Sequence, residues 1–210
     1  MHHALVRLHA RARDARWLSL AIVNLRFLVG FAFVPAGLKK VLGQPFTDPG
    51  RTGAFHEFLH AFHATGGFYR FVGVLQLLAA VLLLTQRHAR WGALLALPII
   101  TAIMVFCWST HVIPTAIVAT LIFLGVLALA AWDARPGPTR VVVGVWQLCG
   151  AAILLLYLGA CALTGEVYRP RGADWRSPAY YALVAMPFLP LAAWFVERRR
   201  WRREPDTMKA

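Results

Sequence analysis

The sequence predicts an all-α protein that crosses a membrane about six times. Hydrophobic residues make up 59% of the 210-residue chain and charged residues only 15%, whereas a soluble domain carries about 25% charged residues. Six apolar runs approach or exceed the length of about 20 residues with which a helix crosses a bilayer. Most of the basic residues lie between or beyond these runs. Together these observations indicate a polytopic transmembrane helical bundle.

The apolar runs divide the chain into a core and a C-terminal pair. We expect a four-helix membrane core over residues 17–132, a linker over 133–140 and a transmembrane hairpin over 141–196. Because Pro187 and Pro190 interrupt the last run, a five-span protein is the alternative. The expected spans are residues 17–38, 67–85, 91–108, 112–132, 141–163 and 178–196.

The longest connection between spans, residues 39–66, has two parts. Its first half is rich in Gly and Pro and predicts turns. Its second half, AFHEFLHAFHA, places Phe55, Phe58 and Phe62 at helical spacing. That pattern predicts a short helix at the membrane surface, because the segment is too short to cross.

The basic residues predict the orientation of the chain. If the basic N-terminus, residues 1–16, is cytoplasmic and forms an uncleaved signal anchor, the inner segments hold 14 Lys and Arg and the outer loops hold 6. This asymmetry obeys the positive-inside rule, so the basic tail, residues 197–210, is also expected in the cytoplasm. The net charge of +13 then serves topology and contact with anionic membrane lipid, and nucleic-acid binding is not expected.

Arg26 lies near the middle of the first span. A guanidinium near the bilayer centre costs about 2.5 kcal/mol or more, so such a residue usually faces the bundle interior and has a partner. Counted along their spans, Gln76 and Thr101 reach the same depth, about 14 Å. No Asp or Glu lies deep in any span. We therefore expect Arg26 to bind an amide, a backbone carbonyl, water or a ligand.

Arg26, Gln76 and Thr101 thus form a predicted polar layer, and two interpretations of it stay open. In the first, Arg26 sets topology and packing, and its guanidinium reaches water or the carbonyls of neighbouring helices. In the second, Arg26, Gln76 and Thr101 line a pocket for a quinone head group or a small oxyanion, since a guanidinium offers several donors to oxygen. Gly30 and Gly37, on the same helix face as Phe33, allow a neighbouring helix to approach closely.

The segment His56-Glu57-Phe58-Leu59-His60 matches the HExxH motif. On a helix, His56 and His60 lie one turn apart and can hold zinc, with the glutamate as general base. His63 or His111 is a candidate third ligand. No further ligand pattern follows the motif, and histidines between phenylalanines are common at membrane surfaces. The sequence therefore favours a surface helix without metal, with zinc binding or a metallohydrolase as alternatives.

Three segments of the core carry a likeness to a known family. They are RFLVGFAFVPAGLKK at 26–40, FVGVLQLLAAVLLL at 71–84 and ALLALPIITAI at 93–103. They resemble the DoxX family of bacterial membrane proteins over roughly residues 17–132. The resemblance implies a four-helix core and a relationship to the small subunit of thiosulfate:quinone oxidoreductase and to proteins linked with redox and sulfur stress. Family members often have a glutamate where this chain has Gln76, which weakens the case for proton transfer there.

These observations lead to a functional expectation. We expect a protein of the bacterial inner (plasma) membrane that is an accessory or quinone-interacting component of a redox or sulfur-stress system. It is expected to be an oxidoreductase subunit rather than an enzyme by itself, because the sequence has no dinucleotide, haem or cysteine-pair motif. Quinone is the candidate cofactor, and a redox protein or further copies of the chain are candidate partners. A metal-binding protein, a structural membrane partner and a small-solute carrier are the alternatives.

Overall fold

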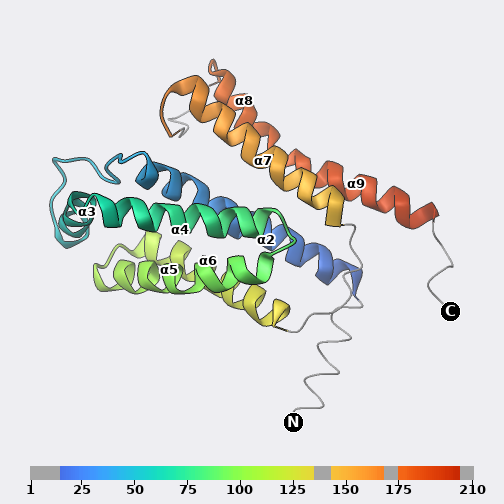
Figure 1. Ribbon diagram of the computed structural model, residues 1–210, viewed down its shortest axis with the longest axis horizontal. Helices are drawn as coiled ribbons and strands as arrows, with labels where there is room; N and C mark the ends of the chain where they lie inside the picture. The colour runs from blue at the N-terminus through green and yellow to red at the C-terminus, as the bar shows by residue number, and fades with distance from the viewer. Residues whose placement is uncertain (1–14, 135–142, 168–174, 204–210) are drawn as a thin grey trace, which may run out of the picture. The chain divides into compact units, whose positions relative to one another are not determined.

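The computed structural model describes residues 15–134, 143–167 and 175–203, and every regular element in these ranges is a helix (Figure 1). This confirms the all-α prediction. Most of the predicted N-terminal segment and linker, half of the connection over residues 164–177 and the C-terminal end of the tail lie outside the described residues. The helices are α2 (Arg16–Val41), α3 (Ala54–Ala64), α4 (Gly67–Leu84), α5 (Ala89–Ser109), α6 (Ile113–Asp133), α7 (Val143–Thr164), α8 (Pro178–Ala185) and α9 (Phe188–Arg203).

Six helical stretches in the described residues are long and apolar enough to cross a membrane, as predicted. The sixth, Pro178–Arg200, contains both α8 and α9. Pro187 interrupts its helical hydrogen bonding because proline has no N–H, so α8 ends at Ala185 and α9 begins at Phe188. The stretches are Arg16–Val41, Gly67–Leu84, Ala89–Ser109, Ile113–Asp133, Gly144–Thr164 and Pro178–Arg200.

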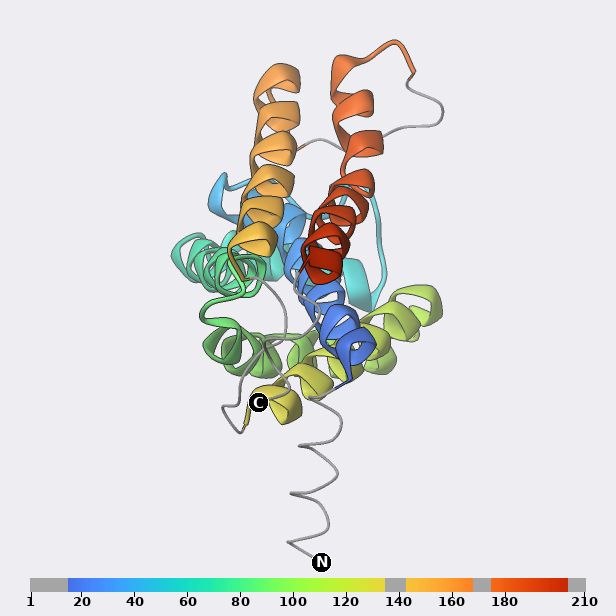
Figure 2. The same cartoon turned by 90° about the vertical axis from the view of Figure 1, so that its right-hand side faces the viewer.

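The helices form two compact units. One unit holds residues 25–84 and 88–134 of the described chain, from the second half of α2 to the end of α6. The other holds the beginning of α2, residues 85–87 and the C-terminal helices. In this second unit α7 lies side by side with α8 and α9 (Figures 1 and 2).

Glycines bring α2 and α4 into direct backbone contact. A Cβ placed on Gly37 would lie 2.9 Å from Leu77 Cγ and 3.0 Å from the carbonyl oxygen of Gly73. A Cβ on Gly30 would meet Leu84 Cγ at 3.1 Å and the Ala80 carbonyl oxygen at 3.3 Å. Residues later in α2 contact residues earlier in α4, so the two helices are antiparallel. The predicted close approach at Gly30 and Gly37 is confirmed, and small residues stabilise such helix pairs in membranes.

Helix α3 is the short helix that the phenylalanine spacing predicts. Its 11 residues include none that is buried. Two of its aromatic rings contact Phe106 of α5: the ring centroids are 5.2 Å apart for Phe55 and 4.4 Å apart for Phe58. These contacts attach α3 to α5.

A buried hydrogen bond joins α7 and α9 in the C-terminal unit. The indole Nε1–H of Trp146, on α7, donates a hydrogen bond to the Glu197 carboxylate on α9. Both side chains are fully buried. Glu197 is thus part of the helical hairpin, whereas the sequence assigned it to the basic tail. The reason is that α9 continues through this residue, and its buried face, with Ala193 and Glu197 one turn apart, packs toward α7.

We predict that Gly73→Ala destabilises the protein by about 1–3 kcal/mol, the usual range for an overpacked interface. The added methyl group would lie 2.7 Å from Lys40 Cβ and 2.9 Å from the carbonyl oxygen of Gly37, and backbone atoms do not move aside easily. Thermal unfolding of the detergent-purified protein measures the effect.

Gly159→Ala is the matched control, because Gly159 is an exposed helical glycine on α7 with no atom within 4 Å of its would-be Cβ. It should leave the melting temperature unchanged or raise it. Equal melting temperatures for Gly73→Ala and wild type would contradict the assignment of α2–α4 packing.

Candidate functional site

Arg26 is held by a carboxylate. Its Nη2 lies 2.6 Å from Oδ1 of Asp133, the last residue of α6, and the side chains are only 8% and 11% exposed. The expectation that Arg26 has no acidic partner is therefore wrong. A charge-assisted hydrogen bond of this length neutralises the guanidinium inside the bundle.

Two features of the helices explain this pairing. The fourth crossing runs antiparallel to the first, and a Cβ on Gly125 of α6 would lie 3.3 Å from Leu25 of α2. Helix α6 therefore packs beside α2 at Leu25, and side chains on a helix lean toward its N-terminus. The long side chain of Arg26 reaches the end of α6 in this way. Counting residues along separate spans does not reveal this pairing, because Asp133 lies at the end of its span.

Gln76 occupies a different position from Arg26. It is 1% exposed, and its Cβ lies 3.1 Å from the Cβ position of Gly37. Gly37 is eleven residues, about 16 Å of helix, beyond Arg26. The structure therefore does not bring Arg26 and Gln76 together. Oε1 of Gln76 has no hydrogen-bond partner among the described residues.

Thr101, the third residue of the predicted pocket, lines an open groove on α5. The groove has a volume of about 800 Å³. The Thr101 hydroxyl donates a hydrogen bond of 2.7 Å to the Leu97 carbonyl of its own helix. The lining residues are Phe58, Leu97, Pro98, Thr101, Ala102, Val105, Phe106 and Ser109.

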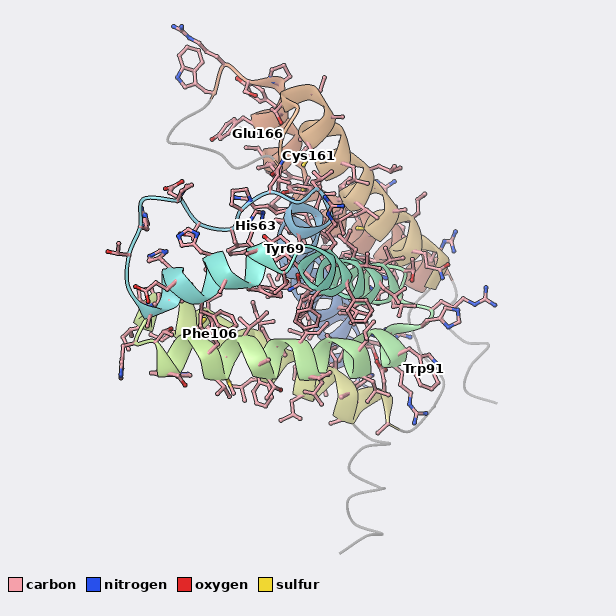
Figure 3. All side chains as sticks on the ribbon, turned by 60° about the vertical axis from the view of Figure 1, so that its left-hand side comes forward. His63, Tyr69, Trp91, Phe106, Cys161 and Glu166 are labelled. Carbon is pink, nitrogen blue, oxygen red and sulfur yellow. The ribbon has the colours of Figure 1, made fainter. Side chains whose placement is uncertain are left out.

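The groove presents a mostly apolar surface with a few polar groups. The rings of Phe58 and Phe106 lie 4.4 Å apart at one end of it, where α3 meets α5 (Figure 3). The hydroxyls of Thr101 and Ser109 are its polar side chains. An apolar wall with a small number of hydrogen-bonding groups is typical of a site for a lipophilic ring compound.

A second buried cation, Lys40, lies at the end of α2. Its Nζ is 3.3 Å from the Ala36 carbonyl oxygen, 4.5 Å from the ring centroid of Phe46 and 5.8 Å from that of Tyr69. The Tyr69 hydroxyl donates a hydrogen bond of 2.8 Å to the Gln44 carbonyl. Aromatic faces stabilise a desolvated ammonium group, so this cluster fixes the connection after α2 to the start of α4.

The three candidate zinc ligands contact different residues of the connection before α3. Nδ1 of His56 is 2.6 Å from Thr47 Oγ1, Nε2 of His60 is 3.4 Å from the Arg51 carbonyl oxygen, and Nε2 of His63 is 3.0 Å from the Gly43 carbonyl oxygen. His63 also lies beside Tyr69 (Figure 3). Within the described ranges, no three His, Cys, Asp or Glu residues are arranged to hold a metal ion. Zinc binding by these histidines stays the alternative interpretation.

Comparison with known proteins finds a family match in the core of the chain. The DoxX family model matches residues 21–111. This part of the chain is similar to a DoxX domain. The predicted resemblance is thereby confirmed over α2 to α5, which include Arg26, Lys40, Gln76 and the groove. No curated protein and no solved structure matches the chain.

Two site residues of this DoxX-like protein are not among those that the sequence predicted. Asp133 follows Trp132 directly at the end of an apolar run, so its helical position was the available signal for a counter-charge to Arg26. Lys40 ends the Gly-Leu-Lys-Lys segment, but nothing in the local pattern distinguishes it from Lys39. Both lysines lie near the Phe46 ring, and the burial of Lys40 against Tyr69 sets the two lysines apart.

We predict that Asp133→Leu destabilises the protein by about 3–5 kcal/mol, because it leaves the buried Arg26 guanidinium without its counter-charge. The double variant Arg26→Met/Asp133→Leu should recover most of this loss, since two apolar side chains can replace a buried ion pair. Chemical or thermal unfolding in detergent measures both.

Asp48→Asn serves as the control. Asp48 also faces an arginine, with its Oδ2 3.8 Å from Arg51 Nε, but its side chain is 84% exposed. Exposed pairs contribute little to stability. The ion-pair assignment fails if the double variant is no more stable than Asp133→Leu.

Proposed function

We propose that this DoxX protein binds a quinone in the groove on α5 and is an accessory, quinone-interacting component of a membrane redox or sulfur-stress system. The proposal places it in the bacterial inner membrane with both termini in the cytoplasm. A catalytic partner protein supplies or accepts the electrons, and the chain contributes the membrane-embedded quinone site.

The observation that carries the proposal is the groove around Thr101. A quinone combines a flat ring, two carbonyl oxygens and a long apolar tail. Phe58 and Phe106 offer aromatic contact to the ring. The exposed side chains of Ala102 and Val105 offer an apolar wall that can be reached from the lipid.

Hydrogen bonding in the groove suits both redox states of such a ring. The Thr101 hydroxyl donates to Leu97, so its lone pairs remain to accept a hydrogen bond from a quinol O–H. The Ser109 hydroxyl can donate to a quinone carbonyl. The pairing of Arg26 with Asp133 supports the groove over the polar layer as the quinone site.

We predict that Ala102→Trp lowers quinone binding at least about tenfold, because an indole in the groove overpacks it by more than the 1.4 kcal/mol that corresponds to this factor. The measurement is the amount of quinone that copurifies with the protein, followed by titration with a short-chain ubiquinone in lipid nanodiscs.

The control is Ala128→Trp, which places the same side chain on an exposed position of α6. It should bind quinone like the wild type. Absence of quinone from the wild-type protein in both measurements would disprove the proposed function, and an equal loss in the two variants would disprove the groove as its site.

A further inference from the structure

Three basic side chains converge where the connection after α2 meets the start of α4. Lys39 Nζ lies 5.9 Å and Lys40 Nζ 4.5 Å from the ring centroid of Phe46. Nη2 of Arg70 lies 3.2 Å from the Cβ position of Gly43, which has a left-handed φ of 68°. Both Gly43 and Phe46 therefore have a cationic group nearby.

The acidic side chains of this connection are engaged elsewhere. Asp48 lies 3.8 Å from Arg51, and Oε1 of Glu57 accepts a hydrogen bond from the Gly53 N–H. Arg70 is exposed and forms no ion pair within the described part of the chain. The local charge is therefore positive and attracts an anion.

Arg70 also heads an apolar column on α4. It is the fourth residue of the helix, which places it at the membrane-surface end of this span. Val74, Leu78 and Val81 follow on the same face and are 52%, 47% and 41% exposed. From Arg70 to Val81 the helix rises about 16 Å, which is about half of a 30 Å bilayer core. The column therefore has the length of one lipid leaflet.

We propose that this surface binds an anionic phospholipid. The Arg70 guanidinium holds the phosphate with two parallel N–H donors, and Lys39 and Lys40 add positive potential at the headgroup. One acyl chain packs along Val74, Leu78 and Val81. The site is on α4, so it does not depend on the quinone groove on α5.

The test is native mass spectrometry of the full-length protein in detergent, titrated with phosphatidylglycerol and, in parallel, with phosphatidylcholine of the same acyl chains. The wild type should prefer phosphatidylglycerol, and added salt should weaken this preference. Arg70→Gln should lower binding of phosphatidylglycerol roughly fivefold, the effect of one basic residue near a membrane surface. Arg70→Lys should retain most of the binding.

Arg51→Gln is the matched control, because it removes the same charge from the same connection but at a residue that faces Asp48. It should leave binding unchanged. Equal losses for Arg70→Gln and Arg51→Gln would show a nonspecific charge effect and overturn the proposal. Wild-type binding that is the same for both lipids would also overturn it, and displacement of the lipid by millimolar inorganic phosphate would assign the site to a free anion instead.

Discussion

An arginine inside an apolar helical bundle needs a counter-charge, because few water molecules are present to solvate it. Asp133 provides that charge at 2.6 Å from Arg26. The pair joins the first and fourth helices of the core, which are 107 residues apart along the chain. It also fixes the end of α6 against α2, so that α4 and α5 connect two helices whose positions the ion pair constrains.

The close contact of α2 with α4 depends on a different force. Between apolar helices in a membrane the hydrophobic effect contributes little, and packing of small residues drives association. Gly30, Gly37 and Gly73 permit this packing, with would-be Cβ contacts as short as 2.7 Å. Helix α2 contacts α4 through its glycines and α6 through the Arg26–Asp133 ion pair. Its buried Arg26 therefore has a partner within the protein. This leaves exposed surfaces on α4 and α5 for lipophilic molecules.

Those two surfaces differ in chemistry. On α5 the groove combines phenylalanine rings with the hydroxyls of Thr101 and Ser109, which suits a neutral ring that forms hydrogen bonds. On α4 the exposed column begins at Arg70 and continues with aliphatic side chains, which suits a charged headgroup with an acyl chain. Helix α3 contacts both regions: Phe58 packs on Phe106, and His63 bonds Gly43. The two proposed binding surfaces thus both have contacts with α3.

The sequence by itself determined the all-helical membrane fold, the six crossings, the short helix α3 and the close approach at Gly30 and Gly37. Each of these follows from local pattern, since apolar length and helical spacing act within a single segment. Tertiary structure alone decided that Arg26 pairs with Asp133, that Gln76 lies about 16 Å along the helix axis from it, and that Phe46 and Tyr69 enclose Lys40. The physical reason is that depth counted along separate spans ignores the direction in which side chains lean and the offset between neighbouring helices, and both are set only when the helices pack.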